Sequence, residues 1–254
     1  MFEQFINELG VGITEFLILS TVSFLGSFIT VALGIGGGVL VLATMAQVLP
    51  PTVLIPIHGV VQFGSNIGRA LLMRKNILLR IIPIFLIGTV LGALLGAKLV
   101  ISLPTPILQS VLGLFVLYSV WFPKFKVSNP GKKTFLAVGF FAAITTMFVG
   151  ATGVLVASFS NAACPDRQQY VATHATLMTL QHGLKIFVFG LLGFAFGPYL
   201  PLLCSLIVCG YAGTWCGKHV LVHIPEKFFR TGLKIILTLL AFRLLYDALH
   251  SSLN

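Results

Sequence analysis

Two sets of polar side chains recur at helical spacing inside apolar stretches of the sequence. Within each set the gaps are the same and in the same order: His58, Gln62, Ser65 and Arg69, then His174, Met178, Gln181 and Lys185. On an α-helix, residues at this spacing share one face. An ionisable side chain in a membrane segment costs at least ~2.5 kcal/mol on insertion scales and usually faces a cavity or a pathway. We therefore expect each face to line the path of a polar solute.

Lys185 and Arg69 are the cations of these two faces. No Asp or Glu occurs between Phe16 and Pro165, so Arg69 has few carboxylate partners and Lys185 has only distant ones. A buried cation without a fixed counter-ion suits a mobile anion. The same scarcity of acids argues against a carboxylate site for Na⁺ or a divalent cation, and no metal site is expected. Arg69 could instead extend to the membrane interface near Arg74, so for this residue a structural role is equally open.

Three histidines supply the groups of these faces that titrate near neutral pH. His58 and His174 occupy matched positions, and His182 lies beside the second face. Because unperturbed imidazole titrates near pH 6.5, these histidines are candidates for coupling proton movement to substrate movement. His219 and His223 have the spacing of a metal-binding pair, but no acid or Cys lies in register with them, which favours a loop or interface pair.

Glycines interrupt the first apolar run of each matched set. Residues 14–49 are broken by Gly34-Ile35-Gly36-Gly37-Gly38, and residues 134–162 by Gly150-Ala151-Thr152-Gly153. Such runs favour a broken or re-entrant helix, the alternative being close helix packing through small residues. A helix that restarts after each break directs free N–H groups and a positive dipole end inward, where they favour a small oxyanion. The expected substrate-site residues are Gly34, Gly36, Gly37, Gly38, His58, Gln62, Arg69, Gly150, Thr152, Gly153, His174, Gln181 and Lys185.

The composition places these features in a lipid bilayer. Of the 254 residues, 57% are apolar and 9% are charged, and the mean hydropathy is +1.03. A soluble chain of this size could not bury that much apolar surface. A cytosolic enzyme, a nucleic-acid binder and a secreted disulfide scaffold are therefore excluded, despite a net charge of +10. The sequence has no phosphate loop, dinucleotide turn, nucleophile elbow or HExxH pair, so neither catalytic residues nor a cofactor are expected.

The sequence indicates an internal duplication, in which each half of the chain has four apolar segments. The Gly-Val-Leu-Val sequence at 38–41 recurs at 153–156, and Gly92 and Gly96 correspond to Gly213 and Gly217. These matches occur in the same order as the two polar faces. We therefore predict an all-α integral membrane protein of two pseudo-symmetric halves, with a shared site between the halves near the bilayer midplane. The first repeat is residues 1–123, a basic cytoplasmic connector is 124–133, and the second repeat is 134–254. The eight apolar runs are 14–49, 54–73, 78–101, 104–122, 134–162, 169–193, 198–220 and 225–249.

The basic residues predict that the two halves are inverted. The loop with Arg74, Lys75 and Arg80 is basic, whereas its counterpart at 193–199 is uncharged. Conversely, residues 101–105 are uncharged, whereas residues 218–227 are basic. By the positive-inside rule, this switch indicates an inverted repeat with both termini outside, in which each half contributes a hairpin and three crossings.

The sequence resembles the TauE/SafE family of sulfite exporters. The resemblance is carried by the first glycine motif, from Gly34 to Leu40, the two four-segment halves, the weaker second glycine break, the Gly92 and Gly96 element, and the prolines Pro104 and Pro225 that begin the last segments. It covers nearly the whole chain, although the second glycine motif is degenerate. It implies a bacterial inner-membrane permease that moves sulfite, sulfonates or related sulfur oxyanions, generally outward. It also implies that Gly34, Gly36, Gly37 and Gly38 border the substrate path.

Together these features predict a multi-pass secondary transporter that exports a small sulfur oxyanion, such as sulfite or an organosulfonate, with proton coupling. The expected partners are the anionic substrate, protons, the lipid bilayer and a second copy of the chain, but no nucleic acid. Two alternatives stay open. One is a permease or channel for another small anion or a thiol compound. The other is a membrane assembly factor without transport activity, which the short polar loops and the matched intramembrane cations disfavour.

Overall fold

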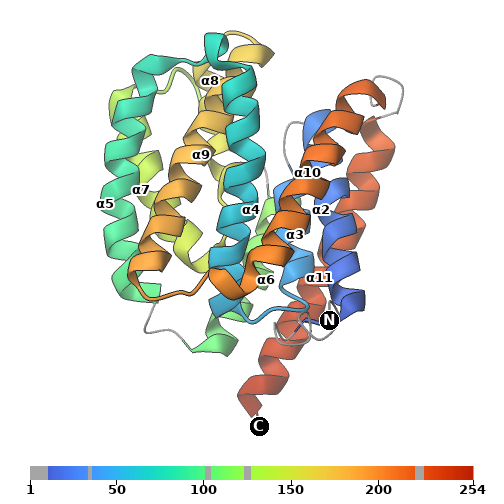
Figure 1. Cartoon of the computed structure of the whole chain (residues 1–254). Coiled ribbons are helices and arrows are strands. Elements are labelled where there is room, and N and C mark those ends of the chain that lie inside the picture. Colours follow the sequence, from blue (N-terminus) through green and yellow to red (C-terminus); the bar gives the residue numbers. More distant parts are fainter. Residues whose placement is uncertain (1–10, 34–35, 101–103, 123–126, 221–225, 254) are drawn as a thin grey trace. The chain divides into compact units, whose positions relative to one another are not determined.

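A computed structural model describes residues 11–33, 36–100, 104–122, 127–220 and 226–253, and this part of the chain is helical without a strand (Figure 1). Three short 3₁₀ turns join the α-helices: η1 (Arg74–Asn76), η2 (Leu79–Ile81) and η3 (Gly197–Tyr199). The α-helices are α2 (Ile13–Leu33), α3 (Gly37–Met45), α4 (Pro51–Leu72), α5 (Ile82–Val100), α6 (Thr105–Trp121), α7 (Lys132–Val149), α8 (Gly153–Ala163), α9 (Arg167–Leu191), α10 (Leu200–Val220) and α11 (Glu226–Leu253).

Four stretches of the described chain are long and apolar enough to cross a membrane. They are Ile13–Thr30, Leu79–Lys98, Lys132–Val149 and Gly197–Gly217. The helices α6 and α8 are apolar but shorter, with 17 and 11 residues. The helices α4 and α9 are long, but the two polar faces lie on them and lower their mean hydropathy. The protein is thus an all-helical membrane protein, whereas eight segments in inverted halves stay a prediction.

The chain divides into two compact units, each built from discontinuous segments. The first unit consists of Met1–His58, Pro104–Phe122 and Ala195–Asn254. In it α2 packs against α10, α6 packs against α11, and α3 contacts α2, α6 and α11. The second unit consists of Gly59–Leu103 and Pro123–Phe194, in which α5 packs against α7 and α9, and α8 contacts α7 and α9. Each unit therefore combines helices from both predicted repeats.

Glycines allow the closest helix pair of each unit to approach backbone to backbone. In the second unit, a Cβ atom on Gly92 of α5 would overlap the carbonyl oxygen of Phe140 on α7. In the first unit, a Cβ atom on Gly213 of α10 would overlap the carbonyl oxygen of Phe24 on α2. Gly92 and Gly213 are matched positions of the sequence duplication. The same contact therefore occurs in both units, as expected for helices that associate through small residues.

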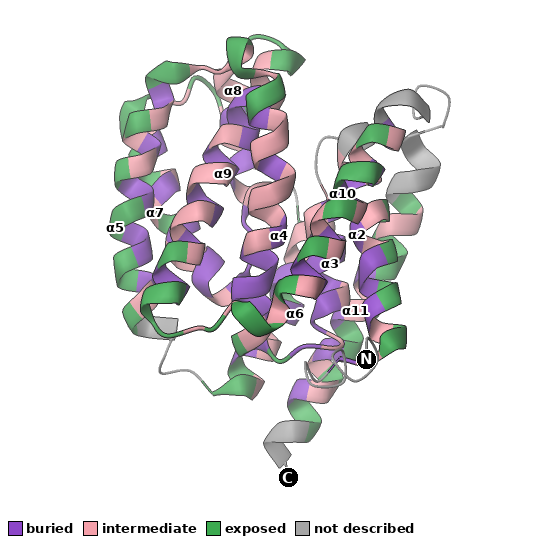
Figure 2. Ribbon diagram, in the orientation of Figure 1, coloured by how far each residue is buried: buried purple, intermediate pink, exposed green. Residues whose placement is uncertain are grey.

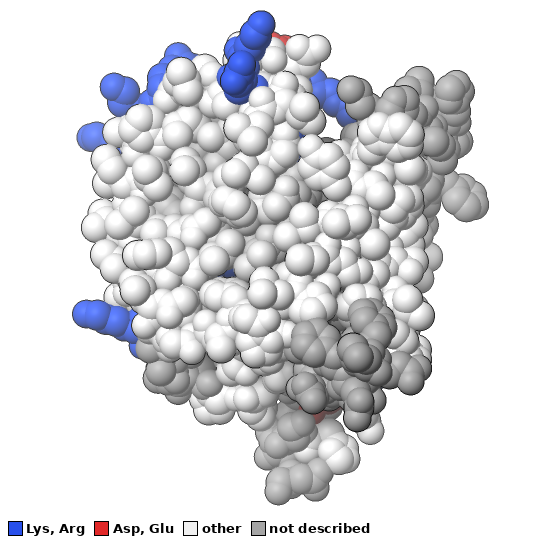
Figure 3. Space-filling view, in the orientation of Figure 1, with Lys and Arg blue, Asp and Glu red and all other residues white. Residues whose placement is uncertain are grey.

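The second unit has a core where α5, α7, α8 and α9 meet. Phe85 and Phe135 are fully buried there, with Val156, Leu177 and Met178 beside them (Figure 2). The opposite faces of the helices are apolar and exposed, as lipid contact requires. Figure 3 shows that Lys and Arg side chains gather near helix ends on the visible face. Examples of exposed apolar residues are Leu91, Leu94 and Leu95 on α5 and Val208 and Trp215 on α10.

We predict that Gly92→Ala destabilises the protein, because the added methyl group meets backbone that cannot move away alone. Overpacking of this kind typically costs ~1–3 kcal/mol. Gly232→Ala on α11 is the matched control, since nothing lies within 4 Å of its Cβ position. Thermal unfolding in detergent, followed by tryptophan fluorescence, should show a lower Tm for Gly92→Ala only. Equal Tm values for both variants would contradict the close α5–α7 contact.

Candidate functional site

A helix break in the second unit provides the centre of the candidate site. Helix α7 ends at Val149, and Gly150 follows with φ 81°, a left-handed conformation that glycine adopts without the strain of a side chain. Helix α8 begins at Gly153, and the side chain of its N-cap residue Thr152 does not cap the first turn. The predicted interruption between Gly150 and Gly153 is therefore present in the structure.

The polar face of α9 lies along this break. The Lys185 side chain donates a hydrogen bond from Nζ to the Gly150 carbonyl oxygen at 2.8 Å. One helical turn earlier, the Gln181 amide donates from Nε2 to the Thr152 hydroxyl at 2.6 Å and to the Ala142 carbonyl oxygen at 2.9 Å. The sequence-predicted residues Gln181 and Lys185 thus lie next to Gly150 and Thr152, and α9 satisfies polar groups that the break leaves unpaired.

Lys185 is a fully buried cation with 0% of its side chain exposed. Within the described part of the chain, the polar contact of Lys185 is the hydrogen bond to the Gly150 carbonyl oxygen, and no carboxylate pairs with Lys185. Its position at the carboxyl end of α7 is favourable, because that end carries the negative pole of the helix dipole. Gly59 makes room for the aliphatic stem, since a Cβ atom there would lie 2.6 Å from the Lys185 Cε atom.

A second group of side chains surrounds His174. Its Nδ1 atom lies 3.2 Å from the Ser160 hydroxyl of α8, and its Nε2 atom lies 3.6 Å from the Cβ position of Gly153. The ring centroid of Tyr170 is 5.7 Å from that of His174. The Arg69 guanidinium interacts electrostatically with both aromatic side chains.

Arg69 differs from Lys185 in where its hydrogen bonds go. Its guanidinium donates to the Ser65 carbonyl oxygen at 3.3 Å, to the Ser65 hydroxyl at 3.4 Å and to the Asn66 side-chain oxygen at 3.1 Å, all on α4. Arg69 lies beside His174. The segment of α9 from His174 to Lys185 is ~16 Å long. The two predicted cations therefore occupy different levels of the unit.

The first unit contains a comparable break. Gly36 is the N-cap of α3 with φ 107°, and Gly37 packs directly against the backbone of Gly26. The His58 imidazole is fully buried and donates from Nε2 to the Gly38 carbonyl oxygen at 3.0 Å. His58 and His174 thus each lie against the first turn of the helix that follows a break. Gly34, the remaining glycine predicted at the site, lies outside the described residues.

Comparison with known proteins identifies the family. The model of the family described as "Sulfite exporter TauE/SafE" matches residues 19–244. The chain belongs to the TauE/SafE family. It is also 25% identical over 252 residues to a Haemophilus influenzae protein described as "Probable membrane transporter protein", with 93% of this chain and 97% of the relative covered. No solved structure matches the chain significantly.

Both comparisons support a multi-pass membrane transporter, and neither points to an enzyme. The TauE/SafE match confirms the resemblance seen in the glycine motifs and the repeated segments. Within the described residues, no group of three or more His, Cys, Asp or Glu side chains could hold a metal ion.

Three residues of this TauE/SafE protein near the breaks were not predicted from the sequence. They are Gly59, which accommodates the Lys185 stem, Ser160, which contacts His174, and Tyr170, whose ring lies beside that of His174 and which interacts electrostatically with Arg69. Ser160 carried a usable signal, because Gly153 and Ser160 are two helical turns apart and share a face of α8. Gly59 carried none beyond its position after His58.

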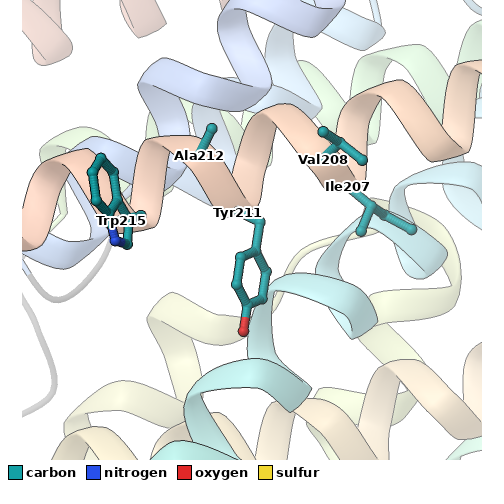
Figure 4. A pocket seen from close by; sticks show the side chains of 5 residues that line it. All are labelled: Ile207, Val208, Tyr211, Ala212 and Trp215. Atoms are coloured by element: carbon teal, nitrogen blue, oxygen red, sulfur yellow. The ribbon is translucent and has the colours of Figure 1, made fainter.

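Two further predicted residues lie on α4 and α9. Gln62 is half-buried on α4, and His182 is buried on α9 with 3% of its side chain exposed. A hollow on α10 is lined by Ile207, Val208, Tyr211, Ala212 and Trp215 (Figure 4). No charged side chain lines it, so this hollow does not suit an anion.

We predict that Gly150→Ala destabilises the protein, because an L-residue in the left-handed region costs ~1–2 kcal/mol. The matched control is Gly197→Ala, which has negative or extended backbone geometry and nothing within 4 Å of its Cβ position. Thermal unfolding of both variants in detergent tests this difference. If Gly150→Ala unfolds at the wild-type temperature, Gly150 does not hold the left-handed conformation that follows α7.

Proposed function

We propose that this protein is a secondary transporter that exports a small sulfur oxyanion, such as sulfite or an organosulfonate, across the bacterial inner membrane with proton coupling. The observation that carries the proposal is the burial of Lys185 beside the α7–α8 break with no described counter-ion. A buried cation of this kind is expensive unless it is paired, and an anionic substrate would supply the missing charge. The family description, sulfite exporter, supports the choice of a sulfur oxyanion.

The groups around the break match the needs of an oxyanion. An ammonium has three N–H donors, and the Gly150 carbonyl accepts one of them, so two can serve the oxygens of the substrate. The first turn of α8, which begins at Gly153 and is not capped by Thr152, adds backbone N–H groups and the positive end of a helix dipole. Gln181 fixes the Thr152 hydroxyl at the edge of this region.

The other predicted site residues take supporting roles in the proposal. The break at Gly36, Gly37 and Gly38 resembles the second break and would contact the substrate in the same way. Arg69 would attract anions at a different level of the path from Lys185, together with Gln62 on the same helix. The histidines His58, His174 and His182 are candidates for proton coupling, and a second copy of the chain is a candidate partner.

We predict that Lys185→Met lowers sulfite flux by about tenfold or more, which corresponds to a loss of ~1.4 kcal/mol or more of interaction. The measurement is uptake of radiolabelled sulfite into proteoliposomes, with and without an imposed pH gradient. The variant removes a buried charge, which is favourable, and the hydrogen bond to the Gly150 carbonyl oxygen, which is unfavourable, so we expect it to fold with a small change in stability. Its Tm in detergent checks this expectation.

Lys132→Met is the matched control, since Lys132 is exposed at the start of α7 and its loss removes the same charge. It should transport sulfite like the wild type. Wild-type flux in Lys185→Met would remove the observation on which the proposal depends. Flux that fails to saturate, or that ignores the pH gradient, would favour a channel over a coupled transporter.

A further inference from the structure

We infer that Lys185 itself carries the coupled proton, so that its side chain is an ammonium while the anion is bound and a neutral amine when the site is empty. This inference rests on the proposed function, because it concerns how the same site is loaded and emptied. It assigns the coupled proton to a lysine, whereas the sequence pattern predicts the histidines as the proton-coupling residues.

The surroundings of Lys185 allow both forms of its side chain. The Nζ atom keeps one partner, the Gly150 carbonyl oxygen at 2.8 Å, and a neutral amine can donate to that oxygen as well as an ammonium can. The stem is held against Gly59, where a Cβ atom would come within 2.6 Å of Cε. Proton loss therefore requires no movement of the side chain and leaves the end of α7 bonded.

No acidic side chain compensates the charge of Lys185 in the described part of the chain. The titratable groups on α9 and on the elements that pack against it are mostly basic, and none of those described interacts electrostatically with Lys185. A fully buried charge in such surroundings is removed by binding an anion or by releasing the proton. The groups concerned are Lys98 on α5, Lys132 and Lys133 on α7, Arg74 and Lys75 on η1, His58 and Arg69 on α4, and Arg167, Tyr170, His174 and His182 on α9, with Asp166 at the N-cap of α9; α8 contributes none.

His174 is less suited to exchange a proton with each substrate. His174 shares its surroundings with Arg69, which stays protonated, so a proton on His174 would place two positive charges together without a described acid between them. Lys185 has no such neighbour.

The resulting cycle balances charge and protons. The neutral amine takes up one proton and one monoanion from the same side, forming one N–H bond and an ammonium–anion pair. On the other side the anion leaves and the N–H bond breaks, which returns the proton to solvent and restores the amine. One proton moves with each negative charge, so transport is electroneutral, and the gradients of anion and pH set its direction.

Lys185→Arg tests this inference, because arginine stays charged and can bind the anion but cannot release the proton. Net flux of sulfite should fall about tenfold or more, whereas exchange of labelled for unlabelled sulfite across the vesicle membrane should continue. Lys132→Arg is the matched control and should support both processes. Net, pH-driven flux in Lys185→Arg at the wild-type rate would overturn the inference.

A second measurement covers the case in which arginine does not fit beside Gly59. The proton-to-anion ratio is measured with methanesulfonate, whose single charge does not change with pH, and a trapped pH dye. The ratio should be one in the wild type and should stay one in the residual flux of His58→Gln and His174→Gln. Loss of coupled protons in either histidine variant would assign the proton to that histidine instead. Wild-type protein that moves neither sulfite nor methanesulfonate would refute the proposed function, a result distinct from altered coupling.

Discussion

The hydrogen bond from Lys185 to the Gly150 carbonyl oxygen connects the features of the second unit. A helix that stops inside an apolar environment leaves backbone groups that must find partners within the protein. Here Lys185 of α9 bonds to the Gly150 carbonyl oxygen after α7, and Gln181 of α9 bonds to the side-chain hydroxyl of Thr152 before α8. This requirement explains why one face of α9 is polar and why α9 is not among the candidate membrane spans.

The two units are built by the same rule from different parts of the chain. Each broken helix is held by a glycine-lined helix of the other predicted repeat: α5 packs on α7 through Gly92, and α10 packs on α2 through Gly213. Neither predicted repeat contains both members of such a pair. The helices of one repeat alone would leave the backbone surface of a broken helix uncovered, so the two repeats are expected to fold together.

Much of this organisation could be predicted from the sequence because it depends on local spacing. Glycine runs indicated both breaks, and gaps of three and four residues indicated the polar faces. The reach of a long side chain depends instead on how helices pack, so no pattern showed that Lys185 meets Gly150 or that its stem passes Gly59. For the same reason, the matched positions Arg69 and Lys185 were expected at one site, whereas Arg69 bonds to its own helix.

The two helix breaks also differ in the chemical groups that lie beside them. The first break has the richer glycine motif, and the described contact there is His58 with the Gly38 carbonyl oxygen. The second break has a degenerate motif, yet it holds the buried cation. Glycines reduce steric obstruction and expose backbone N–H groups, whereas a lysine supplies charge. The first break therefore offers backbone dipoles with little steric obstruction, whereas the second adds a buried lysine.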